Sequence, residues 1–331
     1  STCVVPTIDN SCMHSDHSKD SKAMGPLSKR ELIQMSHLTV DQIKRIDEEA
    51  VILRRKKRMK DFLQSAGDHS ALIVMSLIFA FPLYMVVIIS FMTGGQAETR
   101  SFWPSPFIWS NSVDVFTTVP FLKWTLNTLF ISVMGTIGTV VSSVPAAYVL
   151  SRLQWRGRHT TFIVILGTMM LPGQVTQIPV YIMFAKLGWI PSFLPMIVPS
   201  FFASAFSIFL LRQFFTSIPD EISDAARIDG CSEFKLMMRI VIPLAKPAIS
   251  AIALFAFLGS WNDFFGPLLY LAENPDLYTL GIGLNAFKGD HHTETNLMMT
   301  ASVLFMLPAI VIFFFSQRVF LEGVTLTGVK G

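Results

Sequence analysis

The polar residues with the most informative spacing lie in one charged stretch, 217–247, which separates two long hydrophobic stretches. Ser217 followed by Asp220 three positions later has the pattern of a helix N-cap. Asp220 and Glu221 also place negative charge where the helix dipole is positive. These residues predict a short helix that begins near Ile218. A compact charged element in this position favours a surface that docks another protein.

The remainder of this stretch predicts a second short helix and a contact face. Gly230 fits the left-handed position that ends the first helix, Ser232 can cap the second, and Pro243 ends it because a residue before proline disfavours the α region. Small and apolar side chains recur at helical spacing on the first helix and form a smooth face: Ile218, Ile222, Ala225 and Ala226. The alternative is an amphipathic hairpin that lies on the lipid surface.

A longer pattern in the same stretch resembles the cytoplasmic EAA loop of ABC-importer permeases. It reads Asp224-Ala225-Ala226, three residues, Gly230, nine residues, then Ile240-x-Ile242-Pro243. Asp224 stands where the family usually has Glu, and Ile242 where it usually has Leu; both keep the chemical character of the residue replaced. The resemblance implies that the loop docks on an ATPase subunit through these residues: Glu221, Asp224, Ala225, Ala226, Asp229, Gly230, Ile240 and Pro243.

Two further segments narrow the resemblance to the carbohydrate-uptake class 1 branch, and in particular to the second membrane subunit of maltose-type sugar transporters. They are Trp261-Asn262-Asp263-Phe264-Phe265 with Pro267-Leu268-Leu269, and the C-terminal run 323–331. The resemblance extends from about Ala71 to the C-terminus. It implies a type I ABC importer permease that carries a carbohydrate by alternating access. The implied partners are a second permease subunit in a heterodimer, two ATPase subunits that hold ATP and Mg, and an extracytoplasmic solute-binding protein.

The same resemblance assigns two further contacts. The C-terminal tail is expected to reach the ATPase through Gly323, Gly328, Lys330 and Gly331. The loop 272–296 is expected to be an apolar segment exposed to water that probes the binding protein, with contact residues Tyr278, Gly281, Gly283 and Asn285. The alternatives are a frayed terminus and a loop folded against the outer surface of its own chain.

Composition independently places the chain in a lipid bilayer. Of its 331 residues, 51% are hydrophobic and only 15% are charged, and the mean hydropathy is +0.51. A spanning helix needs ~20 apolar residues to cross a hydrocarbon core of ~30 Å. Segments of this kind predict an all-α membrane protein with six transmembrane helices: Ser70–Met92, Trp124–Leu150, Thr160–Ala185, Phe193–Phe215, Ala248–Leu271 and Leu297–Phe320.

Basic residues predict the orientation and the domain organisation. Most Lys and Arg outside the spans lie before the first span, between the second and third, and around 217–247. The positive-inside rule therefore puts both termini and the charged stretch in the cytoplasm, in the plasma (inner) membrane of a prokaryote. Residues 1–68 are expected to be a cytoplasmic extension, disordered at first and then a basic helix from Thr39 toward Phe62, followed by the permease domain 69–331.

Polar side chains within the predicted spans are candidates for a solute path. Serines in the fourth and fifth spans recur at helical spacing, Asp263 is the clear acid at membrane depth, and two glutamines between Pro172 and Pro179 suggest a broken helix. The candidate path residues are Gln174, Gln177, Ser204, Ser260, Asn262 and Asp263. Close helix packing explains the serines equally well.

Other function classes lack their signatures in this sequence. A P-loop and the HExxH and GxSxG patterns are absent, so we expect no catalytic site and no bound nucleotide in this chain. An ion-coupled secondary transporter of a polar solute, the main alternative, would need more intramembrane carboxylates and two related halves. The spacing of Cys3, Cys12, His14 and His17 matches no zinc site, so no metal is predicted. Cys231 is expected to be reduced in the cytoplasm.

Overall fold

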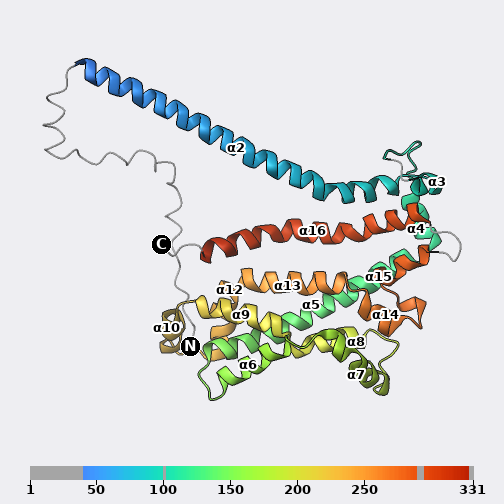
Figure 1. The fold of residues 1–331 in the computed structure, drawn as a ribbon. Helices are drawn as coiled ribbons and strands as arrows, with labels where there is room; N and C mark the ends of the chain where they lie inside the picture. The colour runs from blue at the N-terminus through green and yellow to red at the C-terminus, as the bar shows by residue number, and fades with distance from the viewer. Residues whose placement is uncertain (1–39, 100–101, 289–293, 328–331) are drawn as a thin grey trace. The chain divides into compact units, whose positions relative to one another are not determined.

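The computed structural model describes residues 40–99, 102–288 and 294–327. Every regular element in these ranges is a helix, which confirms the all-α prediction (Figure 1). The chain divides into two compact units, one ending at Leu83 and the other beginning at Tyr84. The described part of the first unit is helix α2 up to Leu83, and the second unit contains the last residues of α2 and the remaining helices.

Helix α2 (Val40–Ser90) is continuous over 51 residues. The sequence predicts two pieces here, a basic helix toward Phe62 and a span from Ser70, and the structure joins them. The segment holds no proline before Pro82, and the single Gly67 costs a helix only about 1 kcal/mol, so nothing breaks it. The boundary expected at residue 68 therefore lies inside one helix, whose part Gln64–Ser90 is long and apolar enough to cross a membrane.

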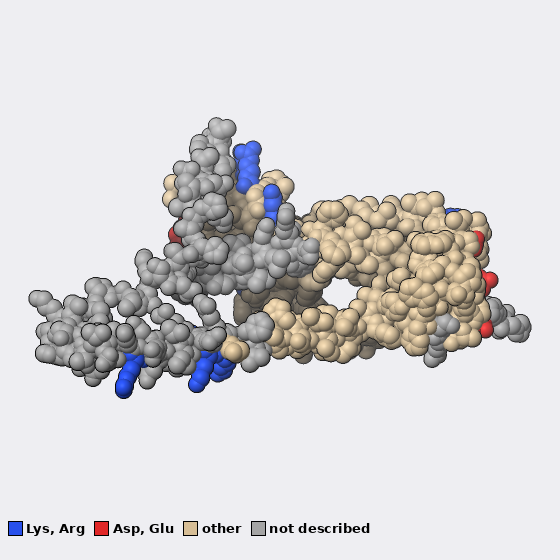
Figure 2. Space-filling model, turned by 90° about the horizontal axis from the view of Figure 1, so that it is seen from above, with Lys and Arg blue, Asp and Glu red and all other residues tan. Residues whose placement is uncertain are grey.

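Among the described residues, four segments are apolar and long enough to span a membrane: Gln64–Ser90, Phe121–Arg152, Leu194–Ser217 and Thr295–Ser316. Two bent helix pairs bring this number to six if each pair is one span, as predicted. Figure 2 shows a face of the chain with a wide stretch that carries no Lys, Arg, Asp or Glu, which suits contact with lipid.

The predicted third span is broken. Helices α6 (Arg158–Thr168) and α7 (Gly173–Lys186) meet at 92°. The break lies at Pro172, which has no N–H to continue the ladder and adopts an extended conformation. A broken helix is confirmed here, although both candidate glutamines lie within intact α7.

The predicted fifth span, Ala248–Leu271, is not one helix. Helix α13 (Lys246–Trp261) ends at Trp261 and α14 (Phe265–Leu271) begins after a short turn. The carboxylate of Asp263 accepts the N–H groups of Phe265 and Gly266, which starts the new helix and explains the break. The bent pair that includes α13 instead joins it to Glu233–Leu244, at an angle of 80°.

The predicted fourth span consists of three consecutive pieces: α8 (Leu194–Ile197), the 3₁₀ helix η1 (Val198–Phe202) and α9 (Ala205–Ser217). Between η1 and α9, Ala203 has a φ of 64°, a left-handed conformation that is strained for a residue with a side chain. The hydroxyl of Ser142 accepts the N–H of Ala203, and Ser143 accepts the N–H of Ser204, so a neighbouring helix fixes the break.

Helix α5 (Phe121–Arg152) is the centre of the second unit and packs most extensively against α13 and α9 (Figure 1). Its only charged residues, Lys123 and Arg152, stand near its two ends. Gly138 lets η1 approach closely, because a Cβ there would lie 2.7 Å from a ring carbon of Phe201. A small residue at this position therefore serves the close packing of the two helices.

Two hydrophobic clusters lie at opposite ends of α5. The first joins Tyr148 of α5 to Phe215 of α9 and Ala226 of the charged stretch. The second joins Trp124 to Trp261 and Phe287. The elements around the second cluster are short, except for the last helix: α3 (Gly94–Glu98), α4 (Asn111–Thr118), η3 (Pro275–Leu277), α15 (Leu280–Gly283), η4 (Leu284–Phe287) and α16 (Thr295–Thr327).

Candidate functional site

The charged stretch forms a compact helical insert after α9, at the end of the second unit opposite α4 and α15 (Figure 1). Its first helix, α10 (Asp220–Ile228), begins two residues later than predicted. Ser217 is not its cap: α9 continues through Ser217, whose hydroxyl donates to the carbonyl of Phe214, and Pro219 takes the N-cap position without a side-chain bond. Burial of Phe215 in the core holds α9 helical up to this point.

The predicted contact face of α10 is divided between the bundle and the surface. Ile218 and Ala226 are buried in the first cluster, together with Ser223 nearby, so these residues attach the insert to its own chain. Ile222 and Ala225 are exposed. The prediction of one smooth outward face is therefore wrong, because the insert must bury part of its own apolar side to stay on the bundle.

The turn after α10 is as predicted. Gly230 has a φ of 79°, and the N–H of Cys231 donates to the carbonyl of Ala226, which is the bond pattern of a glycine-ended helix. Cys231 is disulfide-bonded, which contradicts the expectation of a reduced thiol. The expectation rested on the reducing conditions of the cytoplasm. Those conditions do not indicate which cysteines lie close enough to form a bond.

The second part of the insert runs through Pro243 rather than ending before it. Helix α11 (Glu233–Leu236), with Ser232 as its N-cap, continues into a π-helical turn, η2 (Met237–Val241), and then α12 (Ile242–Leu244). Ile242 is helical, and its N–H donates to Met237, five residues back. In a regular α-helix the proline ring would clash with the carbonyl four residues before it. The wider π turn moves the carbonyls of this turn away from the ring, so the helix can include Pro243.

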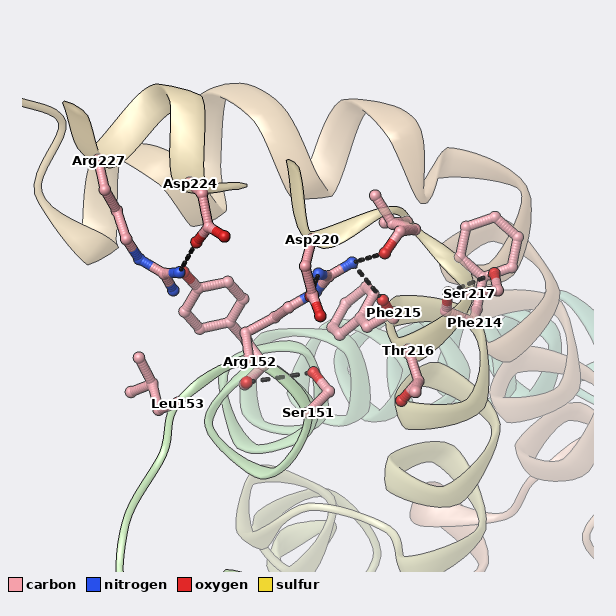
Figure 3. Close-up of polar contacts among 12 residues, drawn as sticks. Ser151, Arg152, Leu153, Phe214, Phe215, Thr216, Ser217, Asp220, Asp224 and Arg227 are labelled. Atoms are coloured by element: carbon pink, nitrogen blue, oxygen red, sulfur yellow. Dashed lines mark hydrogen bonds and ion pairs between the residues drawn. The ribbon is translucent and has the colours of Figure 1, made fainter. Parts of the chain in front are cut away.

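Arg152 connects the insert to the end of α5 (Figure 3). Its side chain is only 2% exposed, and Nη1 donates to Oδ1 of Asp220 at 2.5 Å. Nη2 donates to the carbonyls of Phe215 at 2.6 Å and Ile218 at 2.5 Å. One buried guanidinium thus links α5, the end of α9 and the start of α10, and these bonds compensate the burial of Nη1 and Nη2, whereas Nε has no partner among the described residues.

A second set of contacts links α5 to the other end of α10. The hydroxyl of Tyr148 donates to Oε2 of Glu233 at 2.6 Å. Arg227 donates to Oε1 of Glu233 at 2.8 Å. It also donates to Oδ1 of Asp224 at 2.9 Å (Figure 3). The hydrogen bond that Arg227 donates to the Glu233 carboxylate raises the pKa of Arg227. The sequence does not assign a role to Tyr148 or Arg152; the available signal is their separation by one helical turn at the end of a span.

A polar cleft of about 510 Å³ lies between these two sets of contacts. Its lining includes three arginines and three carboxylates, which partly pair with one another: Arg152, Arg158, Arg227, Asp220, Asp224 and Glu233. Outside the cleft, Ile228 is 87% exposed and Phe234 is 68% exposed. Exposed apolar side chains beside charged ones suit a protein interface more than solvent.

The predicted path residues have structural roles or lie apart. Ser204 is the N-cap of α9, Asp263 starts α14, and the amide of Asn262 donates to Leu258 one turn back. Ser260 lies against Gly135, with its Oγ 3.8 Å from the position of a Cβ there. Gln174 is exposed and Gln177 half-buried on α7, which packs extensively against neither α9 nor α13 in the described residues: the six candidates form no single cluster.

The loop 272–296 is folded against its own chain where the structure describes it. The N–H of Leu280 donates to Thr128, and the amide of Asn127 donates to the carbonyls of Asp276 and Tyr278. Leu280, Ile282, Gly283 and Phe287 are buried. The prediction of an exposed apolar segment is therefore wrong, and the alternative of a loop folded against its own chain is confirmed. Burial of these apolar side chains in the core lowers the free energy relative to their exposure to water. Tyr278 and Gly281 are half-buried, and Asn285 is exposed.

Two of the predicted contact regions, the C-terminal tail and the loop 272–296, are only partly within the described residues. Gly323 lies inside α16, which continues to Thr327, whereas Gly328, Lys330 and Gly331 lie outside the described residues. The polar loop residues Asp290, His291 and His292 are also outside. In the ranges that the structure describes, no group of three His, Cys, Asp or Glu side chains is placed to hold a metal ion.

Comparison with known proteins gives relatives over most of the chain. It is 31% identical over 261 residues to the arabinooligosaccharides transport system permease protein AraQ of Halalkalibacterium halodurans, covering 77% of this chain and 93% of the relative. It is also 31% identical over 265 residues to the sn-glycerol-3-phosphate transport system permease protein UgpE of Pectobacterium atrosepticum, covering 77% and 94%.

A solved structure has the same fold. A chain of a bacterial ABC transporter involved in the import of the acidic polysaccharide alginate superposes with a TM-score of 0.70 at 24% sequence identity, covering 78% of this chain and 97% of that one. Residues 138–325, which contain the whole insert, match the family described as binding-protein-dependent transport system inner membrane component. The chain therefore belongs to this family and is a permease subunit of an ABC importer.

Proposed function

We propose that this permease translocates a carbohydrate that an extracytoplasmic binding protein delivers. The observation that carries the proposal is the insert, a compact helical element that presents Ile228 and Phe234 to solvent while a buried arginine holds it on the bundle. The AraQ relative supports an oligosaccharide as the solute class. The UgpE relative, whose name concerns sn-glycerol-3-phosphate, makes a phosphorylated polyol the second candidate.

In this proposal the insert docks on an ATPase subunit in the cytoplasm. Ile228 and Phe234 supply apolar contact, and an exposed surface around them supplies polar and close contacts: Glu221, Asp224, Ala225, Asp229 and Gly230. Ala226 is buried, so it supports this surface from the inner side of α10 and does not contact the ATPase itself. Ile240 and Pro243 shape the second half of the insert. The C-terminal tail with Gly323, Gly328, Lys330 and Gly331 is a second contact with the ATPase.

The partners follow from this arrangement. A second permease subunit completes the path, two ATPase subunits bind ATP and Mg, and both termini lie on their side of the inner membrane. The binding protein docks at the opposite end, where Asn285 and Asp276 remain exposed. Closure of the ATPase subunits moves the insert, and the spans reorient to open the path outward. Gln174, Gln177 and Asn262 are the candidate path residues that keep exposed or half-buried amides.

Reconstitution tests the proposal. The permease is co-expressed with a second permease subunit and an ATPase subunit, purified, and placed in liposomes with a binding protein. We expect the ATPase to co-purify, and uptake of labelled oligosaccharide to require ATP. Uptake of sn-glycerol-3-phosphate instead would overturn the carbohydrate proposal. Uptake driven by an ion gradient without the ATPase would overturn the importer mechanism and favour the secondary transporter.

A further inference from the structure

Tyr148 and Arg152 stand one helical turn apart at the end of α5, and both are buried. Each reaches a different end of the insert. We propose that these two side chains are positioning residues that fix both ends of α10 to α5, so that a displacement of the docked insert moves α5 directly. This inference rests on the proposed function, because it assumes that the insert docks on the ATPase.

The first clamp acts at the start of α10. Arg152 donates to the carbonyls of Phe215 and Ile218, which stand at the C-terminal end of α9, and to the carboxylate of Asp220. The chain between α9 and α10 consists of Ile218 and Pro219 only, and both are extended in backbone conformation. A two-residue connection of this kind would flex as a hinge. The guanidinium bridges it from the side and keeps α9, α10 and α5 in one arrangement.

The second clamp acts at the end of α10. Tyr148 donates to Glu233 on α11, and Glu233 accepts from Arg227 on the last turn of α10. The connection here passes through Gly230, where no neighbouring atom lies within 4 Å of a Cβ position. Packing therefore does not hold Gly230 itself, although Cys231 beside it packs against the first cluster, and the contacts of Glu233 add a restraint at this end of α10.

The two clamps occupy one face of α5 and have the polar cleft between them. Because α5 is the helix that packs most extensively with α13 and α9, it is the element through which motion of the insert reaches the rest of the bundle. An insert fixed at only one end would rotate about its single remaining clamp. Part of the displacement imposed by the ATPase would then become rotation of the insert and would not move α5. Two-point attachment prevents this loss.

The test uses Tyr148→Phe, which removes only the hydroxyl and keeps the ring in the core. In reconstituted transporter we expect an unchanged yield of co-purified ATPase but about a tenfold fall in solute carried per ATP hydrolysed, the loss expected for one charge-assisted hydrogen bond. Amide hydrogen exchange of Asp220–Ile228 in the assembled transporter should be about tenfold faster. Glu233→Gln should behave similarly, and the double variant should lose less than the sum.

The matched control is Tyr84→Phe, which removes a tyrosine hydroxyl bonded to Phe102 away from the insert and should leave coupling unchanged. Arg152→Lys keeps the charge but cannot reach all three acceptors, and it should lower solute per ATP at normal assembly. A wild-type coupling ratio in Tyr148→Phe would overturn the clamp, as would loss of ATPase co-purification, since that indicates a merely structural role. A wild-type transporter that binds no ATPase would instead count against the proposed function.

Discussion

The indole ring of Trp124 lies against the backbone of Gly283, and a Cβ at Gly283 would meet its Cζ3 at 2.7 Å. The same indole donates to the carbonyl of Pro275 at 3.3 Å. The segment 275–287 is therefore packed onto α5 and belongs to the core at this end of the protein.

Gly283→Ala should overpack this contact and lower the stability of the purified permease by about 1–3 kcal/mol, measured as the midpoint of thermal unfolding in detergent. The control is Gly95→Ala in α3, where no atom lies within 4 Å of the Cβ position. Equal midpoints for the two variants would contradict the packing described here.

Gly230→Val tests the turn of the insert. Its φ of 79° costs a β-branched residue roughly 1–2 kcal/mol, while the open surroundings add no clash. We expect weaker co-purification of the ATPase and slower uptake, and near-normal behaviour in Gly230→Asn, because Asn tolerates the left-handed region. Ala225→Trp, on the exposed side, should also weaken docking by overpacking. Undiminished uptake in both Gly230→Val and Ala225→Trp would show that the insert does not dock there.

Asp263 is either a helix cap or a charge in the solute path, and one pair of substitutions separates these roles. Its Oδ1 accepts two backbone N–H groups of α14 at 3.1 Å. Asp263→Asn keeps the cap and should retain uptake, whereas Asp263→Ala should lose about 1 kcal/mol of stability and reduce uptake. If Asn is as inactive as Ala, the negative charge itself is required and the cap explanation fails.

Ala203→Gly should stabilise the break in the fourth span by about 1 kcal/mol, because glycine adopts a φ of 64° without strain. Thermal unfolding measures the change, with Ala205→Gly on the first residue of α9 as a control that should destabilise. A lower midpoint for Ala203→Gly would indicate that Ala203 is not strained in the folded protein.

Local chemistry allowed the sequence to determine the helical class, the membrane character, the broken third span and the left-handed Gly230. Each depends on residues close in the chain: the length of an apolar run, a proline, or a glycine after a helix. Ser217 is not a cap because the burial of Phe215 in the core, which the cap pattern does not include, keeps α9 helical through Ser217.

Only the tertiary structure decided which residues hold the insert and whether the loop 272–296 is exposed or packed. Arg152 meets carbonyls that lie 63 and 66 residues along the chain, and Thr128 binds Leu280 across 152 residues. From the sequence, Arg152 is predicted to be a cytoplasmic charge and 278–287 an exposed apolar loop. The helices that pack together determine whether each of these segments is buried and which groups it bonds. A pattern of neighbouring residues does not contain that information.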